Sequence, residues 1–268
     1  MKKALLAVLV FCIMQAIASV ILVVPMTFMG LSSPHPATFT IIAMALIVSG
    51  IATFLICWKG LKVIEFPATF KGLGTKWKWA LVAIIGAFSG VFAGDLLSEI
   101  ANLPNIVEDT FEGLAENVWG TLAIAIIGPI VEELVFREGI CGHLMRSGAN
   151  KWKAIWVSAV IFGIIHFNPA QVPFAILMGV ILGVIYVKTG NIVITSIIHV
   201  LNNSIAVVQY WVLGEKIEDF SMVEWIGGSY VAGICIIVGF ALCYYLLRRF
   251  WESDTTIETD ELGGYDKG

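Results

Sequence analysis

The feature that most constrains this chain is the repetition of apolar runs long enough to cross a lipid bilayer. A helix needs about 20 apolar residues to cross ~30 Å of hydrocarbon. This length predicts eight spans, at 4–30, 38–58, 79–98, 118–146, 153–167, 173–187, 191–213 and 223–247. Since helices satisfy their own backbone hydrogen bonds in lipid, we expect an all-α polytopic membrane protein, a bundle of about eight transmembrane helices.

The composition excludes an ordinary soluble domain. Hydrophobic residues make up 59% of the 268 residues and charged residues 13%, against roughly 45–50% and about 25% in soluble domains. The net charge of -4 comes without a basic patch, which argues against a nucleic-acid partner. The five cysteines show no metal-ligand spacing, so neither a disulfide framework nor a cysteine-ligated zinc is predicted.

Lysine and arginine gather at one end of the predicted bundle. They precede the first span and follow the second, fourth, sixth and eighth, whereas the 95–116 loop carries six acids and no base. Because cytoplasmic loops retain basic residues, both termini are predicted to be cytoplasmic. The first apolar run is too long for the core of a signal peptide.

The chain divides into four predicted parts. Residues 1–117 form three N-terminal spans and an acidic outer loop, 118–213 a catalytic membrane core, and 214–250 the last transmembrane helix. Residues 251–268 form an acidic cytoplasmic tail without a periodic apolar face, which we expect to be disordered.

Three charged residues interrupt the fourth span. Each of Glu132, Glu133 and Arg137 costs about 2.5–3.5 kcal/mol at the membrane centre unless it is paired, neutralised or hydrated. Glu133 and Arg137 have the i, i+4 spacing of a helical ion pair, which leaves Glu132 without a local partner. The alternative is that Arg137 and Glu138 already lie at the cytoplasmic boundary, with the glutamates snorkelling there.

Other polar side chains are predicted at the same depth as Glu132. His166 ends the fifth span, and His199 and Asn203 share one face of the seventh. At about 1.5 Å per residue, all four groups lie ~16–22 Å from the basic residue at the end of their span. Singly, a His or Asn in a membrane helix more often joins helices, and His35, His143 and Asn168 rank lower.

Two kinds of chemistry fit these four residues. A carboxylate can take a proton from water, an imidazole can share that water or protonate a leaving amine, and the remaining donors can hold an oxyanion. Alternatively, Glu132, His166 and His199 could ligate zinc with one open position. The sequence lacks a His-Glu-x-x-His helix.

The order of the motifs resembles a known family. Glu132-Glu133-x-x-x-Arg137, Phe162-x-x-x-His166 and His199-x-x-x-Asn203 are similar to the motifs of the CPBP intramembrane proteases, which include CAAX prenyl endopeptidases and bacteriocin-processing proteins. The resemblance covers roughly residues 128–204.

The resemblance implies an eight-helix bundle with a cavity open to the cytoplasmic side. Glu132 and His166 would activate water, His199 and Asn203 would bind the oxyanion or assist, and Glu133 and Arg137 would form a supporting pair. No cofactor is expected, since zinc would leave the Asn without a role, although zinc remains the alternative. The implied partners are membrane lipids and a hydrophobic or lipid-anchored peptide or protein, for which prenylation is not assumed.

Two functions of other classes remain. Intramembrane Glu, His and Asn also serve proton- or ion-coupled carriers, but carriers commonly consist of two related halves, and the charged motifs here occur only after residue 118. A non-enzymatic scaffold or immunity protein that keeps the motif is the other alternative.

Overall fold

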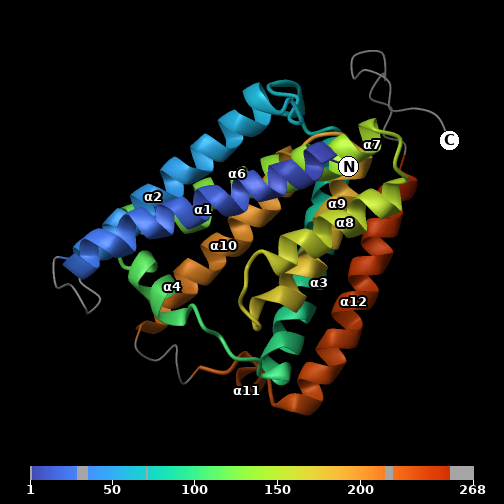
Figure 1. Cartoon of the computed structure of the whole chain (residues 1–268). Coiled ribbons are helices and arrows are strands. Elements are labelled where there is room, and N and C mark those ends of the chain that lie inside the picture. Colours follow the sequence, from blue (N-terminus) through green and yellow to red (C-terminus); the bar gives the residue numbers. More distant parts are fainter. Residues whose placement is uncertain (1, 29–35, 71, 215–219, 254–268) are drawn as a thin grey trace.

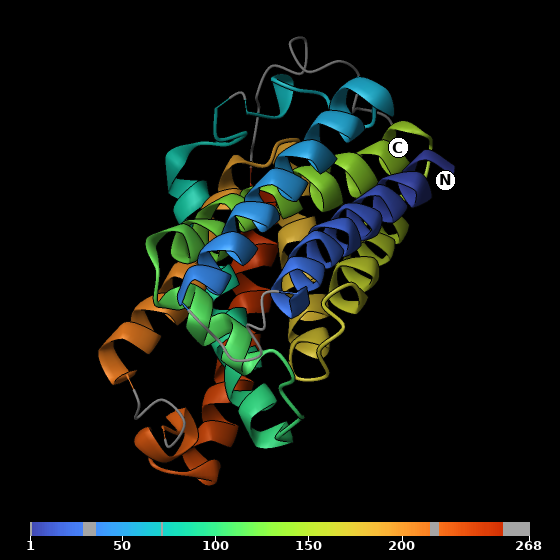
Figure 2. The same cartoon turned by 60° about the vertical axis from the view of Figure 1, so that its left-hand side comes forward.

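The fold is a bundle of helices (Figures 1 and 2). The computed structural model describes residues 2–28, 36–70, 72–214 and 220–253, and it contains no strand in these ranges. The predicted all-α polytopic membrane fold is confirmed. His35 and residues 254–268 of the predicted tail lie outside the described residues.

Eight long helical segments correspond to the predicted spans. Six of them are long and apolar enough to cross a membrane, namely 38–60, 77–101, 118–146, 171–189, 193–213 and 229–252. The single helices are α1 (Lys2–Phe28), α2 (Pro36–Leu55) continued by the π-helix η1 (Ile56–Gly60), α3 (Trp77–Ala101), α8 (Lys151–Ile164), α9 (Gln171–Thr189), α10 (Val193–Leu213) and α12 (Ser229–Glu252). Short helices connect them: η2 (Ala68–Phe70), α4 (Glu108–Ala115) and α11 (Met222–Trp225).

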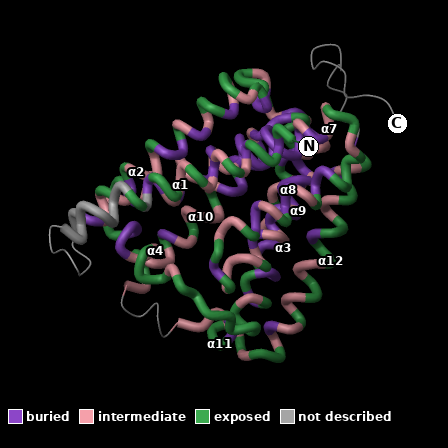
Figure 3. Tube along the Cα trace, in the orientation of Figure 1, coloured by how far each residue is buried: buried purple, intermediate pink, exposed green. Residues whose placement is uncertain are grey.

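The fourth segment is central and composite. It runs through α5 (Val118–Thr121), η3 (Leu122–Ile127), α6 (Gly128–Glu132), η4 (Glu133–Gly142) and α7 (His143–Arg146). The segments η3 and η4 are π-helices, whose i→i+5 bonds occur frequently at functional sites. All ten residues of η4 are buried, and buried residues gather around it, α8 and α9 (Figure 3).

Three predicted boundaries are corrected. The last span begins at Ser229 rather than at residue 223, because Gly227 and Gly228 adopt φ values of 116° and 88° that separate α11 from α12. α8 ends at Ile164, so His166 lies in the following turn and not within the helix. The sixth span begins at Gln171 rather than at residue 173, and Pro173 lies in the first turn of α9, where proline is tolerated.

The lysine-rich and acidic parts of the chain lie at opposite ends of the bundle. The N-terminus and α7 mark one end in Figure 1, and α4 and α11 lie toward the other. The α4 helix was not predicted; Glu108 and Asp109 in its first turn interact favourably with the helix dipole.

Helices α3 and α12 pack closely because small residues line their contact. Gly86 and Gly90 of α3 face α12, and Gly94, four residues further on, faces α9; this spacing of small residues lets membrane helices approach each other. A Cβ atom on Gly90 would lie 2.6 Å from Cys243 Sγ of α12. In the reverse direction, a Cβ atom on Gly239 would lie 2.9 Å from Ala93 Cβ.

We predict that Gly90→Leu separates α3 from α12. Because overpacking costs about 1–3 kcal/mol, the midpoint of thermal unfolding in detergent should fall by several degrees. Gly233→Leu is the matched control, since nothing lies within 4 Å of a Cβ atom at that position of α12. Equal midpoints for the two variants would contradict the close contact.

Candidate active site

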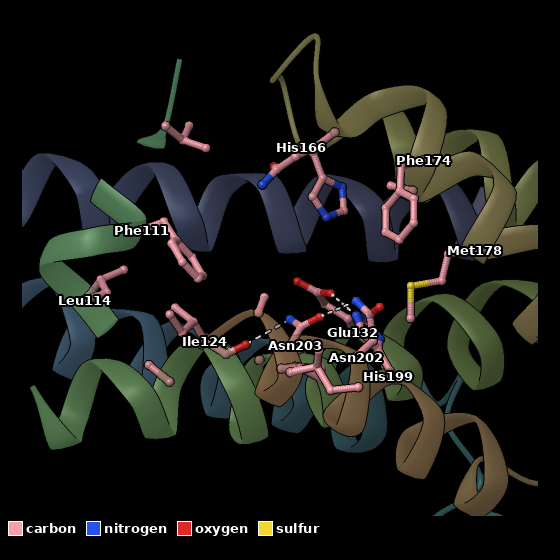
Figure 4. Close-up of a pocket in the computed structure, with 18 of the residues that line it drawn as sticks. Phe111, Leu114, Ile124, Glu132, His166, Phe174, Met178, His199, Asn202 and Asn203 are labelled. Atoms are coloured by element: carbon pink, nitrogen blue, oxygen red, sulfur yellow. Dashed lines mark hydrogen bonds and ion pairs between the residues drawn. The ribbon is translucent and has the colours of Figure 1, made fainter. Parts of the chain in front are cut away.

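A cavity of about 780 Å³ brings the four predicted site residues together. Glu132 comes from α6, His166 from the turn after α8, and His199 and Asn203 from α10. Figure 4 shows the His166 ring pointing toward Glu132 from the opposite side of the pocket. The convergence that the depth argument predicts is therefore present, while the catalytic roles stay predictions.

His199 lies between two carboxylates. Its Nδ1 lies 3.0 Å from Glu133 Oε1, and its Nε2 lies 3.6 Å from Glu132 Oε2. Because a carboxylate accepts hydrogen bonds, Nδ1 carries a hydrogen. Nε2 points toward Glu132, which lines the cavity. The side chain of Glu132 is 23% exposed, whereas that of His199 is 4% exposed. Glu132 is thus the accessible carboxylate, and Glu133 fixes the ring.

Glu133 also forms the predicted ion pair with Arg137. Arg137 Nε lies 3.2 Å from Glu133 Oε2, and both side chains are fully buried. The Arg137 guanidinium also lies 4.4 Å from the centre of the Phe162 ring, within the range of a cation–π interaction. Glu133 and Arg137 do not snorkel to water, because both side chains are fully buried.

A second buried polar cluster, which the sequence did not predict, lies nearer the lysine-rich end. Glu138 Oε1 accepts from Arg146 Nη1 at 2.7 Å, and Glu138 Oε2 accepts from the Tyr186 hydroxyl at 2.6 Å. Arg146 also donates from Nη2 to the Val63 carbonyl at 2.6 Å. The cluster joins α7 and η4 to α9 and to the loop after η1. The Arg146 side chain, from which the depth of Glu132 was measured, is therefore partly buried in this cluster and only 19% exposed.

The His166 ring is oriented by its own backbone. Its Nδ1 lies 2.7 Å from the Phe162 carbonyl, so Nδ1 donates and, in the neutral ring, Nε2 is left as the acceptor. The Phe162 ring contacts both imidazoles edge-on, with centroid distances of 5.0 Å to His166 and 5.7 Å to His199. Phe162, a motif residue without an assigned role, therefore packs against His166, His199 and Arg137.

Asn203 is held by the irregular helix η3. Its Nδ2 donates to the Ile124 carbonyl at 2.9 Å, and its Oδ1 accepts from Asn202 at 3.2 Å. Figure 4 shows this contact with Ile124 beside the pocket. One amide hydrogen of Asn203 is used in this way, and its second remains for a ligand.

Asn168 and His143 have no contact with the predicted site. Asn168 is buried and joins the loop before α4, accepting from the Ile106 backbone at 3.1 Å and donating to Asn105 at 2.8 Å. It therefore does not orient His166. His143 lies in α7 and is absent from the described lining of the cavity.

The described lining of the cavity reaches the acidic end of the bundle. It includes Asp95, Glu99, Thr110 and Phe111 and no lysine, whereas sequence analysis expects the mouth of the cavity at the lysine-rich end.

The three residues of the zinc alternative do not form a ligand set. Among the described residues, no three His, Cys, Asp or Glu side chains are grouped so that they could hold a metal ion. His199 Nδ1 lies at Glu133 and His166 Nδ1 at a backbone carbonyl, an arrangement that histidines bound to a metal also show. In Figure 4, His166 and His199 lie on opposite sides of the pocket.

Comparison with known proteins confirms the resemblance of the segment that carries the motifs. Residues 114–205 match the family described as type II CAAX prenyl endopeptidase Rce1-like. The membrane-embedded CAAX protease MroQ of Staphylococcus aureus (strain USA300) is 37% identical over 90 residues, which cover 32% of this chain and 36% of that protein. The putative membrane peptidase YdiL of Bacillus subtilis (strain 168) is 27% identical over 141 residues, 51% of this chain and 57% of that protein.

The matches are partial. The chain spans about a third of the length of the first relative and somewhat more than half of the second. No solved structure matches the chain. The matched segment 114–205 contains Glu132, His166, His199 and Asn203.

We predict that Arg137→Ala destabilises the fold. Removing one partner of a buried pair leaves an uncompensated charge, which costs about 3–5 kcal/mol, so the midpoint of thermal unfolding should fall sharply. Arg248→Ala is the control, because Arg248 pairs with Glu252 at the same i, i+4 spacing but both side chains are exposed. Its midpoint should not move measurably, and a normal midpoint for Arg137→Ala would contradict the buried pair.

Proposed function

We propose that the protein is an intramembrane endopeptidase in which Glu132 activates a water molecule. The observation that carries the proposal is the accessible Glu132 carboxylate beside the buried Glu133–His199 pair. Glu132 Oε2 lies 3.6 Å from His199 Nε2, and His166 faces it across the cavity (Figure 4). A base needs both access to water and fixed neighbours, and Glu132 has both.

The proposed reaction follows from these positions. Glu132 takes one proton from water, and the water oxygen bonds to the carbonyl carbon of the peptide. The carbonyl oxygen becomes an oxyanion, which the second N–H of Asn203, and His199 Nε2–H when that ring is protonated, stabilise. The C–N bond then breaks, and the leaving nitrogen receives a proton from Glu132 or through His166, whose Nε2 faces the pocket.

Glu133 and Arg137 serve as positioning residues in this proposal. Glu133 holds His199 at 3.0 Å, and Arg137 lies 3.2 Å from the other oxygen of Glu133. The proposed reaction assigns no step to a metal.

The proposed substrate is a hydrophobic or lipid-anchored peptide. The cavity wall is largely apolar and includes the side chains Phe111, Ile124, Phe174 and Met178 (Figure 4). The two relatives are named a membrane-embedded CAAX protease and a putative membrane peptidase. With the lysine-rich end in the cytoplasm, as we propose for both termini, the substrate would enter from the opposite side of the membrane.

We predict that Glu132→Gln abolishes cleavage while the protein stays folded. The amide keeps the shape of the side chain but cannot accept the proton, so turnover should fall by about 10²–10⁴-fold. The test uses purified protein in lipid nanodiscs and a pool of apolar peptides, with products identified by mass spectrometry. Glu108→Gln, on the exposed surface of α4, should cleave like the unmodified protein. Unreduced cleavage by Glu132→Gln would overturn the proposal.

We also predict that cleavage does not depend on a metal ion. Dialysis against a chelator should leave the rate within about twofold, because the proposed base is a carboxylate and not a metal-bound water. Loss of activity with chelator, restored by added zinc but not by magnesium, would favour the zinc alternative.

A further inference from the structure

We propose that Asp95 determines specificity by binding a positively charged group of the substrate. This inference rests on the proposed function. It assigns to the cavity a substrate class that combines an apolar peptide with one cationic nitrogen, supplied by a lysine or arginine side chain or by a free amino terminus.

Asp95 belongs to the membrane-spanning helix α3, although sequence analysis counts it both in the span 79–98 and in the acidic 95–116 loop. Helix α3 continues to Ala101, six residues beyond Asp95. Phe92, Asp95, Ser98 and Glu99 all line the cavity, with the i, i+3, i+4 spacing of one helix face. The Asp95 carboxylate therefore projects into the same space as Glu132.

The cavity is negatively charged. Its described lining contains three carboxylates, those of Asp95, Glu99 and Glu132, and neither lysine nor arginine. A cleft lined by one sign of charge between low-dielectric walls attracts ligands of the opposite sign. A peptide with a cationic group is therefore favoured over an acidic one.

Two of the three carboxylates already have a partner. Glu99 Oε1 accepts from the Ser221 hydroxyl at 2.5 Å and from the Val223 backbone N–H at 3.1 Å, which holds the start of α11. Glu132 faces His199. Asp95 contacts no hydrogen-bond or ion-pair partner among the described residues, and its side chain is exposed to the cavity.

An unpaired carboxylate in a membrane helix is costly, and such residues mark ligand pathways. A cationic group of the substrate would stabilise the Asp95 carboxylate by forming an ion pair with it. The aromatic residues Phe92, Phe111 and Phe174 line the same space, so the neighbouring substrate side chains are expected to be apolar.

The test compares apolar peptides that differ at one position. A lysine is moved along the sequence and replaced by norleucine in the matched peptide, and each peptide is made with a free and with an acetylated amino terminus. The unmodified protein in nanodiscs should cleave at least one lysine peptide about tenfold faster than its norleucine match, in line with a hydrogen bond between charged groups. A preference seen only with the free terminus would identify the α-amino group as the cation.

Asp95→Asn should bring the lysine-to-norleucine ratio close to one. Asp109→Asn is the matched control, because Asp109 lies on the exposed surface of α4 outside the described cavity lining, and it should keep the ratio. An unchanged ratio for Asp95→Asn, with cleavage still dependent on Glu132, would overturn the inference and leave the proposed function intact.

A binding measurement separates this inference from catalysis. Fluorescent lysine and norleucine peptides are titrated onto Glu132→Gln protein and onto the Glu132→Gln/Asp95→Asn double variant. We expect a Kd ratio of about ten for the first and about one for the second. Equal ratios would overturn the role of Asp95, whereas the expected ratios without any cleavage by the unmodified protein would overturn the peptidase proposal alone.

Discussion

The site depends on the buried carboxylate of Glu133. One of its oxygens binds Arg137 on the same helix and the other binds His199 on α10. Because an uncompensated charge in the membrane is costly, both contacts stabilise the buried carboxylate, and the one with His199 joins η4 to α10. The contact between Glu133 and His199 also places the adjacent residue, Glu132, beside His199 in the cavity.

The irregular form of the fourth segment explains why Glu132 and Glu133 serve different purposes. Helix α6 ends at Glu132, and the π-helix η4 begins at Glu133. Another π-helix, η3, precedes α6 and contributes the Ile124 carbonyl that binds Asn203. Between these two π-helices, regular α-helical geometry is limited to α6, the turn that carries the proposed base.

The sequence predicted those parts of the structure that depend on local spacing. Apolar runs determined the spans, and the i, i+4 spacing predicted the Glu133–Arg137 pair. It did not predict which carboxylate binds His199, because this contact joins residues 66 positions apart. Nor did it predict the Asn203–Ile124 bond, which joins residues 79 positions apart, or that α3 continues to Ala101, beyond the predicted end of the third span at residue 98. The distances from the basic residues predicted that Glu132, His166, His199 and Asn203 converge, and all four line one cavity.

The two contacts of Glu133 differ in when the growing chain can make them. Arg137 is four residues away and is available as soon as this turn of helix forms, whereas His199 must wait for two further membrane segments, α8 and α9, to be synthesised. The local pair therefore neutralises Glu133 during insertion, and the long-range bond completes the site afterwards. Arg137 can therefore compensate the charge of Glu133 before the helices that complete the cavity have been synthesised.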